Sequence, residues 1–102
     1  MDPISSAGLI KIIRLTLRPG HRERFLESQG VWNRESRSAL GYLGEVLGES
    51  GPDELYVLTF WRSRDEYERW MEQHDRIATL AGAEAHYDRL DVRVIDRLAE
   101  TE

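Results

Sequence analysis

The stretch "TFWRSRDEYERWMEQH", residues 59–74, joins the end of one predicted element to the start of the next, and it decides the fold. Its first three residues complete an apolar run, and Ser63 is followed three residues later by Glu66. This spacing is a capping box, in which each side chain can bind the free backbone amide of the other residue. We therefore predict that a strand ends at Trp61 and that a helix begins at Ser63.

The predicted helix carries an apolar stripe. Its members recur at helical spacing and share one face, and they are Tyr67, Trp70, Met71, His74, Ala78 and Ala81. Gly82 is the predicted end of the helix. The stripe is either an ordinary buried face or the wall of a pocket, and spacing alone leaves both readings open.

The predicted elements outside this helix are four strands and one helix. They are a strand in 8–20, a helix in about 20–40 with a break predicted near Gly30, a hairpin of strands 41–49 and 54–61 around "SGPD", and an alternating strand in 87–98. The order βαββαβ predicts a ferredoxin-like α+β sandwich with both helices on one face of the sheet.

We predict one domain over residues 1–102, with a flexible leader (1–8) and a flexible tail (98–102). The first and third strands are apolar on both sides of their alternation, so one sheet face would remain in water. A second copy of the chain would cover it, and we therefore predict a homodimer.

Composition excludes several classes of function. The net charge is −5 with acids and bases interspersed, which argues against a nucleic-acid partner. Lys11 is the only lysine among 14 basic residues, and we attach no function to it. The chain has no cysteine and no run of about 18 apolar residues, which favours the cytoplasm and predicts no membrane partner.

We also predict neither a metal nor a cofactor. His86 and Asp88 share a face at the start of the last strand, but two ligands without a third make a weak metal signal. No phosphate-binding glycine loop, dinucleotide fingerprint or nucleophile elbow is present in the sequence.

Three motifs carry a resemblance to a known family: "IRLTLRPG" (13–20), "GYLGEV" (41–46) and "LTFWRSRDEYERWMEQH" (58–74). Over about residues 9–97 the chain resembles the dimeric α+β barrel proteins of the antibiotic biosynthesis monooxygenase type. The resemblance implies a cavity between the helices and the sheet. It does not imply one reaction, because this fold hosts oxygenases, haem-degrading enzymes, isomerases, cyclases and proteins with no known activity.

Two branches of that superfamily have characteristic residues at positions that can be matched in this sequence. In the branch that oxidises anthrone-like polyketides without a cofactor, a tryptophan closes the third strand and a tyrosine follows six residues later, as Trp61 and Tyr67 do. Val57 stands where that branch has an asparagine. The haem-degrading branch has a tryptophan in the second helix, which Trp70 matches. Ile13 and Leu80 stand where that branch has an asparagine and a histidine, so the resemblance does not imply haem.

Cofactor-free oxygenation needs an apolar cavity, a base and one or two hydrogen-bond donors. His74 is the predicted base, because an imidazole titrates near neutral pH; its alternative is a core histidine bound to backbone. Trp61 and Tyr67 complete the predicted catalytic set. The predicted substrate contacts are Trp70, Arg14, Trp32 and Asn33. Each has a non-functional alternative. The aromatic side chains could simply pack in the core, Arg14 could extend into solvent from a sheet edge, and Asn33 could be an exposed helical residue.

The leading functional hypothesis is a homodimeric, cofactor-independent monooxygenase that uses O2 on an aromatic polyketide-like substrate, an anthrone or a phenol, in natural-product biosynthesis. One alternative is a non-redox polyketide cyclase or isomerase on the same fold. Another is a non-catalytic small-molecule-binding dimer. Val57 favours both alternatives over the oxygenase.

Overall fold

The structure is a computed structural model that describes residues 3–73 and 86–98. A short helix, α1 (Pro3–Ser6), precedes the six main elements. These are β1 (Leu9–Leu17), α2 (Arg22–Ser36), β2 (Tyr42–Gly51), β3 (Glu54–Trp61), α3 (Arg64–Met71) and β4 (Tyr87–Asp96). The predicted βαββαβ order and the α+β ferredoxin-like fold are confirmed.

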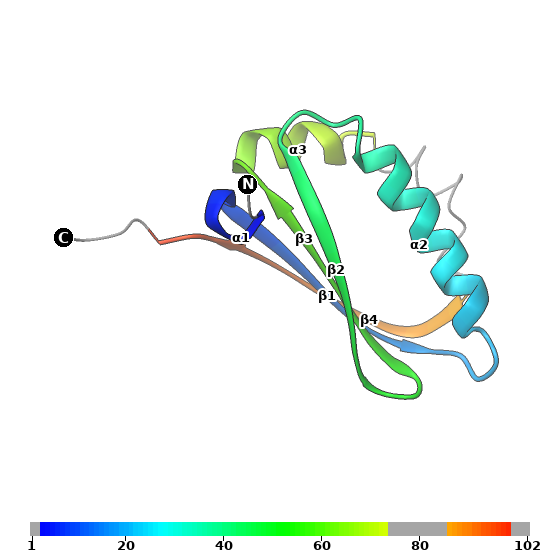
Figure 1. Cartoon of the computed structure of the whole chain (residues 1–102). Coiled ribbons are helices and arrows are strands. Elements are labelled where there is room, and N and C mark those ends of the chain that lie inside the picture. Colours follow the sequence, from blue (N-terminus) through cyan, green and yellow to red (C-terminus); the bar gives the residue numbers. More distant parts are fainter. Residues whose placement is uncertain (1–2, 74–85, 99–102) are drawn as a thin grey trace.

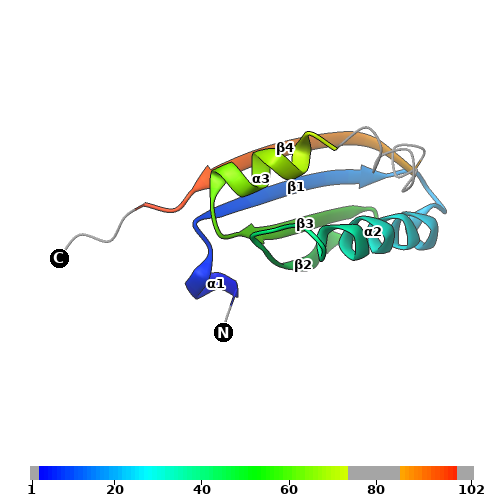
Figure 2. The same cartoon turned by 90° about the horizontal axis from the view of Figure 1, so that it is seen from above.

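The four strands form one antiparallel sheet in the order β2-β3-β1-β4. Helices α2 and α3 lie on the same side of it (Figures 1 and 2). Because side chains alternate along a strand, the odd-numbered residues of β1 face the helices and the even-numbered residues face away. We call these the inner and the outer face of the sheet.

Two clusters of buried side chains fill the space under the helices. One lies beneath α2 and the other beneath α3. Their members are Leu15, Leu17, Phe25, Leu55 and Val57 in the first, and Leu9, Trp61, Tyr67 and Trp70 in the second. The aromatic stripe of the opening stretch therefore packs on the sheet as far as the described residues follow it.

Helix α2 runs without interruption through Gly30, so the predicted break is wrong. A glycine in a helix costs about 1 kcal/mol relative to alanine. Phe25, Ser28, Gln29 and Ser36 of this helix are buried against the rest of the molecule. Tertiary packing of one face supplies most of the stability of a helix in a protein, and here it outweighs the glycine.

Helix α3 begins where predicted, with Ser63 as its N-cap, but the Glu66 carboxylate binds the Ser63 hydroxyl instead of the Ser63 backbone amide. The Ser63 hydroxyl accepts a hydrogen bond from the Glu66 backbone amide at 3.3 Å, and it donates to the Glu66 carboxylate at 2.9 Å. The Arg62 guanidinium binds the same carboxylate. Helix α3 ends at Met71 with Glu72 as its C-cap, so the predicted single helix from Ser63 to Gly82 is wrong. The predicted stripe residues His74, Ala78 and Ala81 lie outside the described residues.

The segment predicted as a flexible leader contains α1 and is tied to the sheet. Ala7 is buried, and the Gly8 amide donates to the Trp61 carbonyl at 2.9 Å. A Cβ at Gly8 would lie 2.4 Å from the Arg62 carbonyl oxygen, so only glycine allows this approach. Residues 99–102 of the predicted tail lie outside the described part of the chain. Within that part, no helix is both long enough and apolar enough to span a bilayer.

Candidate functional site

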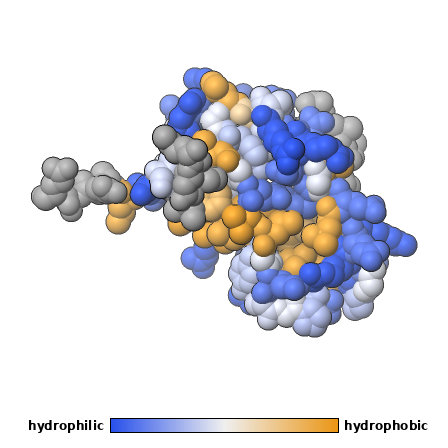
Figure 3. Space-filling view, viewed as in Figure 1, coloured by the Kyte–Doolittle hydropathy of each residue, from blue (hydrophilic) through white to orange (hydrophobic). Residues whose placement is uncertain are grey.

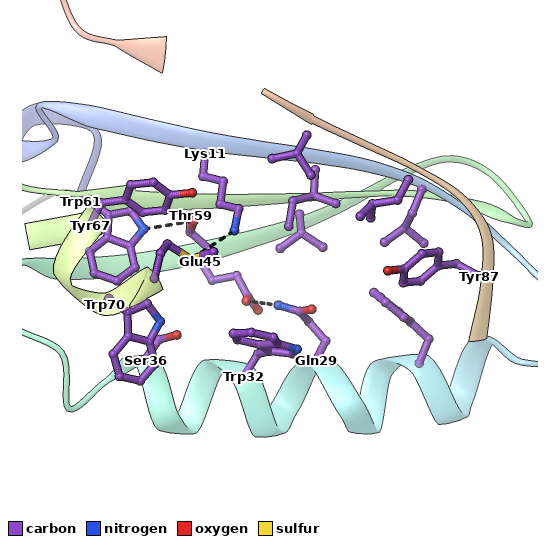
Figure 4. Close-up of a pocket in the computed structure, with 17 residues that line it drawn as sticks. Lys11, Gln29, Trp32, Ser36, Glu45, Thr59, Trp61, Tyr67, Trp70 and Tyr87 are labelled. Carbon is purple, nitrogen blue, oxygen red and sulfur yellow. Dashed lines mark hydrogen bonds between the residues drawn. The ribbon is translucent and has the colours of Figure 1, made fainter. Parts of the chain in front are cut away.

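A cavity of about 140 Å³ lies between the inner face of the sheet and the helices (Figure 4). All four strands, α2 and α3 contribute side chains to its lining, most of them apolar. An apolar protein cavity of about 150 Å³ is known to hold a benzene ring. The space is therefore suited to one aromatic ring.

One end of the cavity is aromatic. Trp61, Tyr67, Trp70 and Trp32 line it, and the first three are buried. The Trp61 and Tyr67 rings meet edge to face with centroids 5.5 Å apart, and Trp61 Nε1 donates to Thr59 Oγ1 at 3.2 Å. Burial raises the pKa of the Tyr67 phenol, which therefore remains a hydrogen-bond donor at neutral pH. The same aromatic residues therefore belong to the buried core and form the wall of the cavity.

Lys11 enters the cavity from β1 (Figure 4). Its Nζ lies 3.7 Å from the Met71 sulfur and 5.5 Å from the centroid of the Tyr67 ring. Both are weak partners for a cation. No carboxylate among the described residues forms an ion pair with Lys11, and burial lowers the pKa of its ammonium group.

Glu45 brings a carboxyl group into the same cavity from β2. Gln29 of α2 donates to its Oε2 at 2.7 Å. Burial raises the pKa of Glu45, and the Gln29 hydrogen bond and the charge of Arg37 partly oppose this rise. The cavity thus holds a base and an acid whose pKa values are both displaced toward neutrality, an arrangement common at functional sites.

Four of the seven predicted site residues meet at the cavity: Trp61, Tyr67, Trp70 and Trp32. Asn33 does not line it. Its Oδ1 accepts a 2.7 Å hydrogen bond from the Tyr42 hydroxyl, and the Tyr42 ring packs against Trp61 with centroids 5.2 Å apart. Asn33 therefore supports the aromatic wall from behind. The seventh residue, the predicted base His74, lies outside the described residues.

Arg14 is on the wrong face for the predicted contact with a ligand in the cavity. It lies on the outer face of β1, where its Nε donates to Glu54 Oε1 at 2.8 Å. Strand alternation is the reason, because Lys11, Ile13 and Leu15 occupy the inner face on this strand. Val57, at the position of the expected family asparagine, does line the cavity and is 1% exposed.

His86 and Asp88 do not converge. His86 Nδ1 lies 3.1 Å from His21 Nδ1, whereas Asp88 accepts a hydrogen bond from Arg18 Nε at 3.1 Å. The described residues contain no group of three side chains able to hold a metal ion. These two residues are thus engaged with separate partners.

Sequence reasoning missed five polar residues of the cavity, Lys11, Gln29, Ser36, Glu45 and Thr59. A signal for Lys11 was present, since the only lysine of the chain shares the alternation of Leu9, Leu15 and Leu17. Glu45 and Gln29 gave no such signal. They are 16 residues apart and meet only because α2 packs across β2.

Comparison with solved structures supports this architecture. The Pseudomonas aeruginosa protein PA3566 is 26% identical, with a TM-score of 0.71 over 92% of this chain and 97% of its own. Rv0793 of Mycobacterium tuberculosis is 22% identical, with a TM-score of 0.74 over 92% and 98%.

A Bordetella bronchiseptica protein provisionally named an antibiotic biosynthesis monooxygenase is 19% identical, with a TM-score of 0.68 over 90% and 99%. The chain therefore has the fold of solved proteins that carry this family name, as the resemblance implies. No curated protein matches the sequence. One family model matches residues 9–95, and the chain accordingly belongs to the family described as a domain of unknown function, DUF4937.

Proposed function

We propose that the protein is a cofactor-independent monooxygenase that oxidises a small phenolic compound in natural-product biosynthesis. The observation that carries this proposal is the cavity itself, which combines an aromatic wall with Lys11 and Glu45. Its volume of about 140 Å³ favours a single-ring phenol over a three-ring anthrone. The family name carried by the Bordetella protein supports the same class of reaction.

The proposed reaction makes modest demands on the protein. A base removes the phenolic proton, the resulting anion passes an electron to O2, and the two radicals combine at a ring carbon. One oxygen atom stays in the product as a quinone oxygen and the other leaves as water. The electrons come from the substrate, so the protein has to bind, deprotonate and exclude bulk water.

Within this proposal the aromatic residues have separate roles. Trp61 and Trp70 contact the substrate ring face to face or edge to face. Trp32 closes the side of the cavity that α2 forms. The Tyr67 hydroxyl donates a hydrogen bond to the developing oxyanion. His74 is retained as a candidate base on the strength of the sequence and the resemblance.

A cyclase or an isomerase is the second candidate, and Val57 favours it. An apolar valine on the cavity wall supplies no amide to bind a peroxide. The acid and base that Glu45 and Lys11 provide are sufficient for moving a proton along an enolisable substrate. A non-catalytic binding dimer is the third candidate.

We further propose that the protein is a homodimer joined through the outer face of the sheet. The β-sheet register places Ile12, Leu58 and Val46 in one apolar row across three strands. Val46 is 50% exposed, and Ile95, paired with Ile10 beside this row, is 45% exposed. Figure 3, viewed as in Figure 1 with β2 in front, shows apolar residues across the middle of the molecule; the residues of the outer face are those given by the register.

An oxygen electrode tests the enzymatic proposal with single-ring phenols. We expect uptake of one O2 for each quinone formed. His74→Leu, if His74 is the base, should lower kcat by about 10² to 10⁴ while the protein remains folded. Product formation without O2 uptake would instead establish a cyclase or isomerase, and tight binding without turnover would establish a binding protein.

A further inference from the structure

We propose that Lys11 is the anchoring base of the cavity: its amine accepts the proton of an acidic phenol and the resulting ammonium group holds the phenolate. This inference rests on the proposed function, because it assumes that a small aromatic compound enters the cavity. It defines the ligand class more narrowly, as single-ring phenols acidic enough to bind as anions.

The geometry around Lys11 carries the proposal. Nζ lies beside the Met71 sulfur and the Tyr67 ring, and neither can neutralise a charge. The titratable groups that line the cavity with it are Tyr67 on α3, Glu45 on β2 and Tyr87 on β4, and α2 contributes uncharged side chains only. The Glu45 carboxylate is already bound by Gln29.

An ammonium group in apolar surroundings is costly unless it loses its proton or gains an anion. Burial lowers the pKa of Lys11, so its amine is more readily neutral than an exposed lysine. When a phenol enters, its O–H bond breaks and an N–H bond forms on Nζ, without any change in the net charge of the pair. The ammonium–phenolate attraction is stronger in this cavity than in water because the local dielectric constant is lower.

The surroundings also restrict the anion. The aromatic wall and the limited volume admit one planar ring, whereas a small carboxylate would leave the aromatic end unfilled. A phenolate fits both parts, with its ring against the wall and its oxygen at Nζ. The phenolate is also the electron-rich form that the proposed oxygenation requires, so Lys11 competes with His74 for the role of the base.

The probe for this inference is p-nitrophenol, which absorbs visible light only as the phenolate. Equilibrium dialysis measures its binding, and absorbance across pH measures the ionisation of the bound fraction. In the wild type we expect the bound probe to ionise about 1 to 3 pH units lower than in water, which is at least tenfold more phenolate at a given pH. In Lys11→Met it should ionise at a higher pH than in water, because the cavity then has no cation and keeps its apolar wall and the Glu45 carboxyl group.

Arg14→Met is the matched control. It removes a cation from the same strand on the outer face, and the bound probe should ionise as in the wild type. Lys11→Gln is the second variant if Lys11→Met fails to fold. Unchanged ionisation in folded Lys11 variants, or loss of the effect in His74→Leu but not in Lys11→Met, would overturn the assignment.

The uncharged ether p-nitroanisole separates this inference from the function on which it rests. It has no acidic proton, and we expect it to bind to the wild type and to Lys11→Met with similar affinity. If the ether binds and bound p-nitrophenol ionises at the same pH as in water, the role of Lys11 is refuted but the aromatic-ligand proposal stands. If neither compound binds to the wild type, the aromatic-ligand proposal fails and the inference fails with it.

Discussion

Lys11 and Arg14 are cations three residues apart on one strand, and they have opposite environments. Lys11 points to the inner face, has no described anionic partner and has a pKa lowered by burial. Arg14 points to the outer face, and the hydrogen bond that it donates to Glu54 raises its pKa. Strand alternation decides which of the two cations enters the cavity, and the lowered pKa of Lys11 makes it the one that gives up its proton more readily.

Val57 and Leu58 are neighbours on β3, and their environments on the two faces of the sheet differ in the same way. Val57 is buried on the inner face and lines the cavity. Leu58 is half-buried on the outer face, opposite Ile12 and Val46. The inner face holds both clusters of buried side chains, whereas the outer face is a surface that a second copy is proposed to cover.

The largest difference between the faces should appear when an aspartate is placed on each. Val57→Asp buries a charge with no partner and should destabilise the fold by more than about 4 kcal/mol, so that the variant is unfolded or strongly destabilised. Leu58→Asp should remain folded and sediment as a monomer. Circular dichroism with urea titration and analytical ultracentrifugation measure both outcomes. A stably folded Val57→Asp would mean that the inner face is not the core.

A smaller effect is expected from the cavity wall. Trp61→Phe removes the Nε1 hydrogen bond to Thr59 and part of the ring, which should lower the free energy of unfolding by about 1 to 2 kcal/mol. Affinity for a phenolic ligand should fall about 3- to 10-fold, because an edge-to-face aromatic contact contributes about 0.5 to 1.5 kcal/mol. Trp70→Phe tests the same wall without the Thr59 bond. Unaltered affinity in both variants would place the ligand elsewhere.

Much of this architecture was predictable because its signals are local. A run rich in Ile and Leu predicted β1, alternation predicted β4, and the Ser63–Glu66 spacing predicted the start of α3. The site was less predictable. Arg14 and Lys11 interrupt the same apolar run, and Arg14 was chosen although only Lys11 shares the alternation of the buried residues. The Glu45–Gln29 contact depends on how a helix crosses a strand, which no local pattern encodes.

Lys11→Met should stabilise the protein at neutral pH by about 1 kcal/mol, because it removes a side chain that must either stay charged in apolar surroundings or give up its proton. The sign of the pH dependence follows from the lowered pKa. The unfolded chain binds more protons than the folded chain between the lowered pKa and the ordinary value of 10.5, so wild-type stability rises with pH in that window.

The advantage of Lys11→Met should therefore be largest at neutral pH and shrink as the pH approaches 10.5. Both proteins share the tyrosines that titrate at alkaline pH, so the difference between their urea midpoints isolates Lys11. A constant difference across this range would mean that Lys11 has the same pKa in the folded and unfolded chains.

Arg14→Met should have the smallest effect, and it completes the comparison with Lys11. The Arg14 and Glu54 side chains are 56% and 30% exposed, and exposed ion pairs contribute little to stability because water and salt screen them. We expect its urea midpoint to match that of the wild type in molar salt and to differ only slightly at low salt.

If the outer face joins two copies, Arg14 borders the interface. The variant should then change how the melting temperature depends on protein concentration rather than the stability of each subunit. Melting curves at several protein concentrations separate the two effects. A loss of stability in Arg14→Met that is independent of concentration and persists in molar salt would show that Arg14 is part of the core, and the contrast between the two faces of β1 would then be wrong.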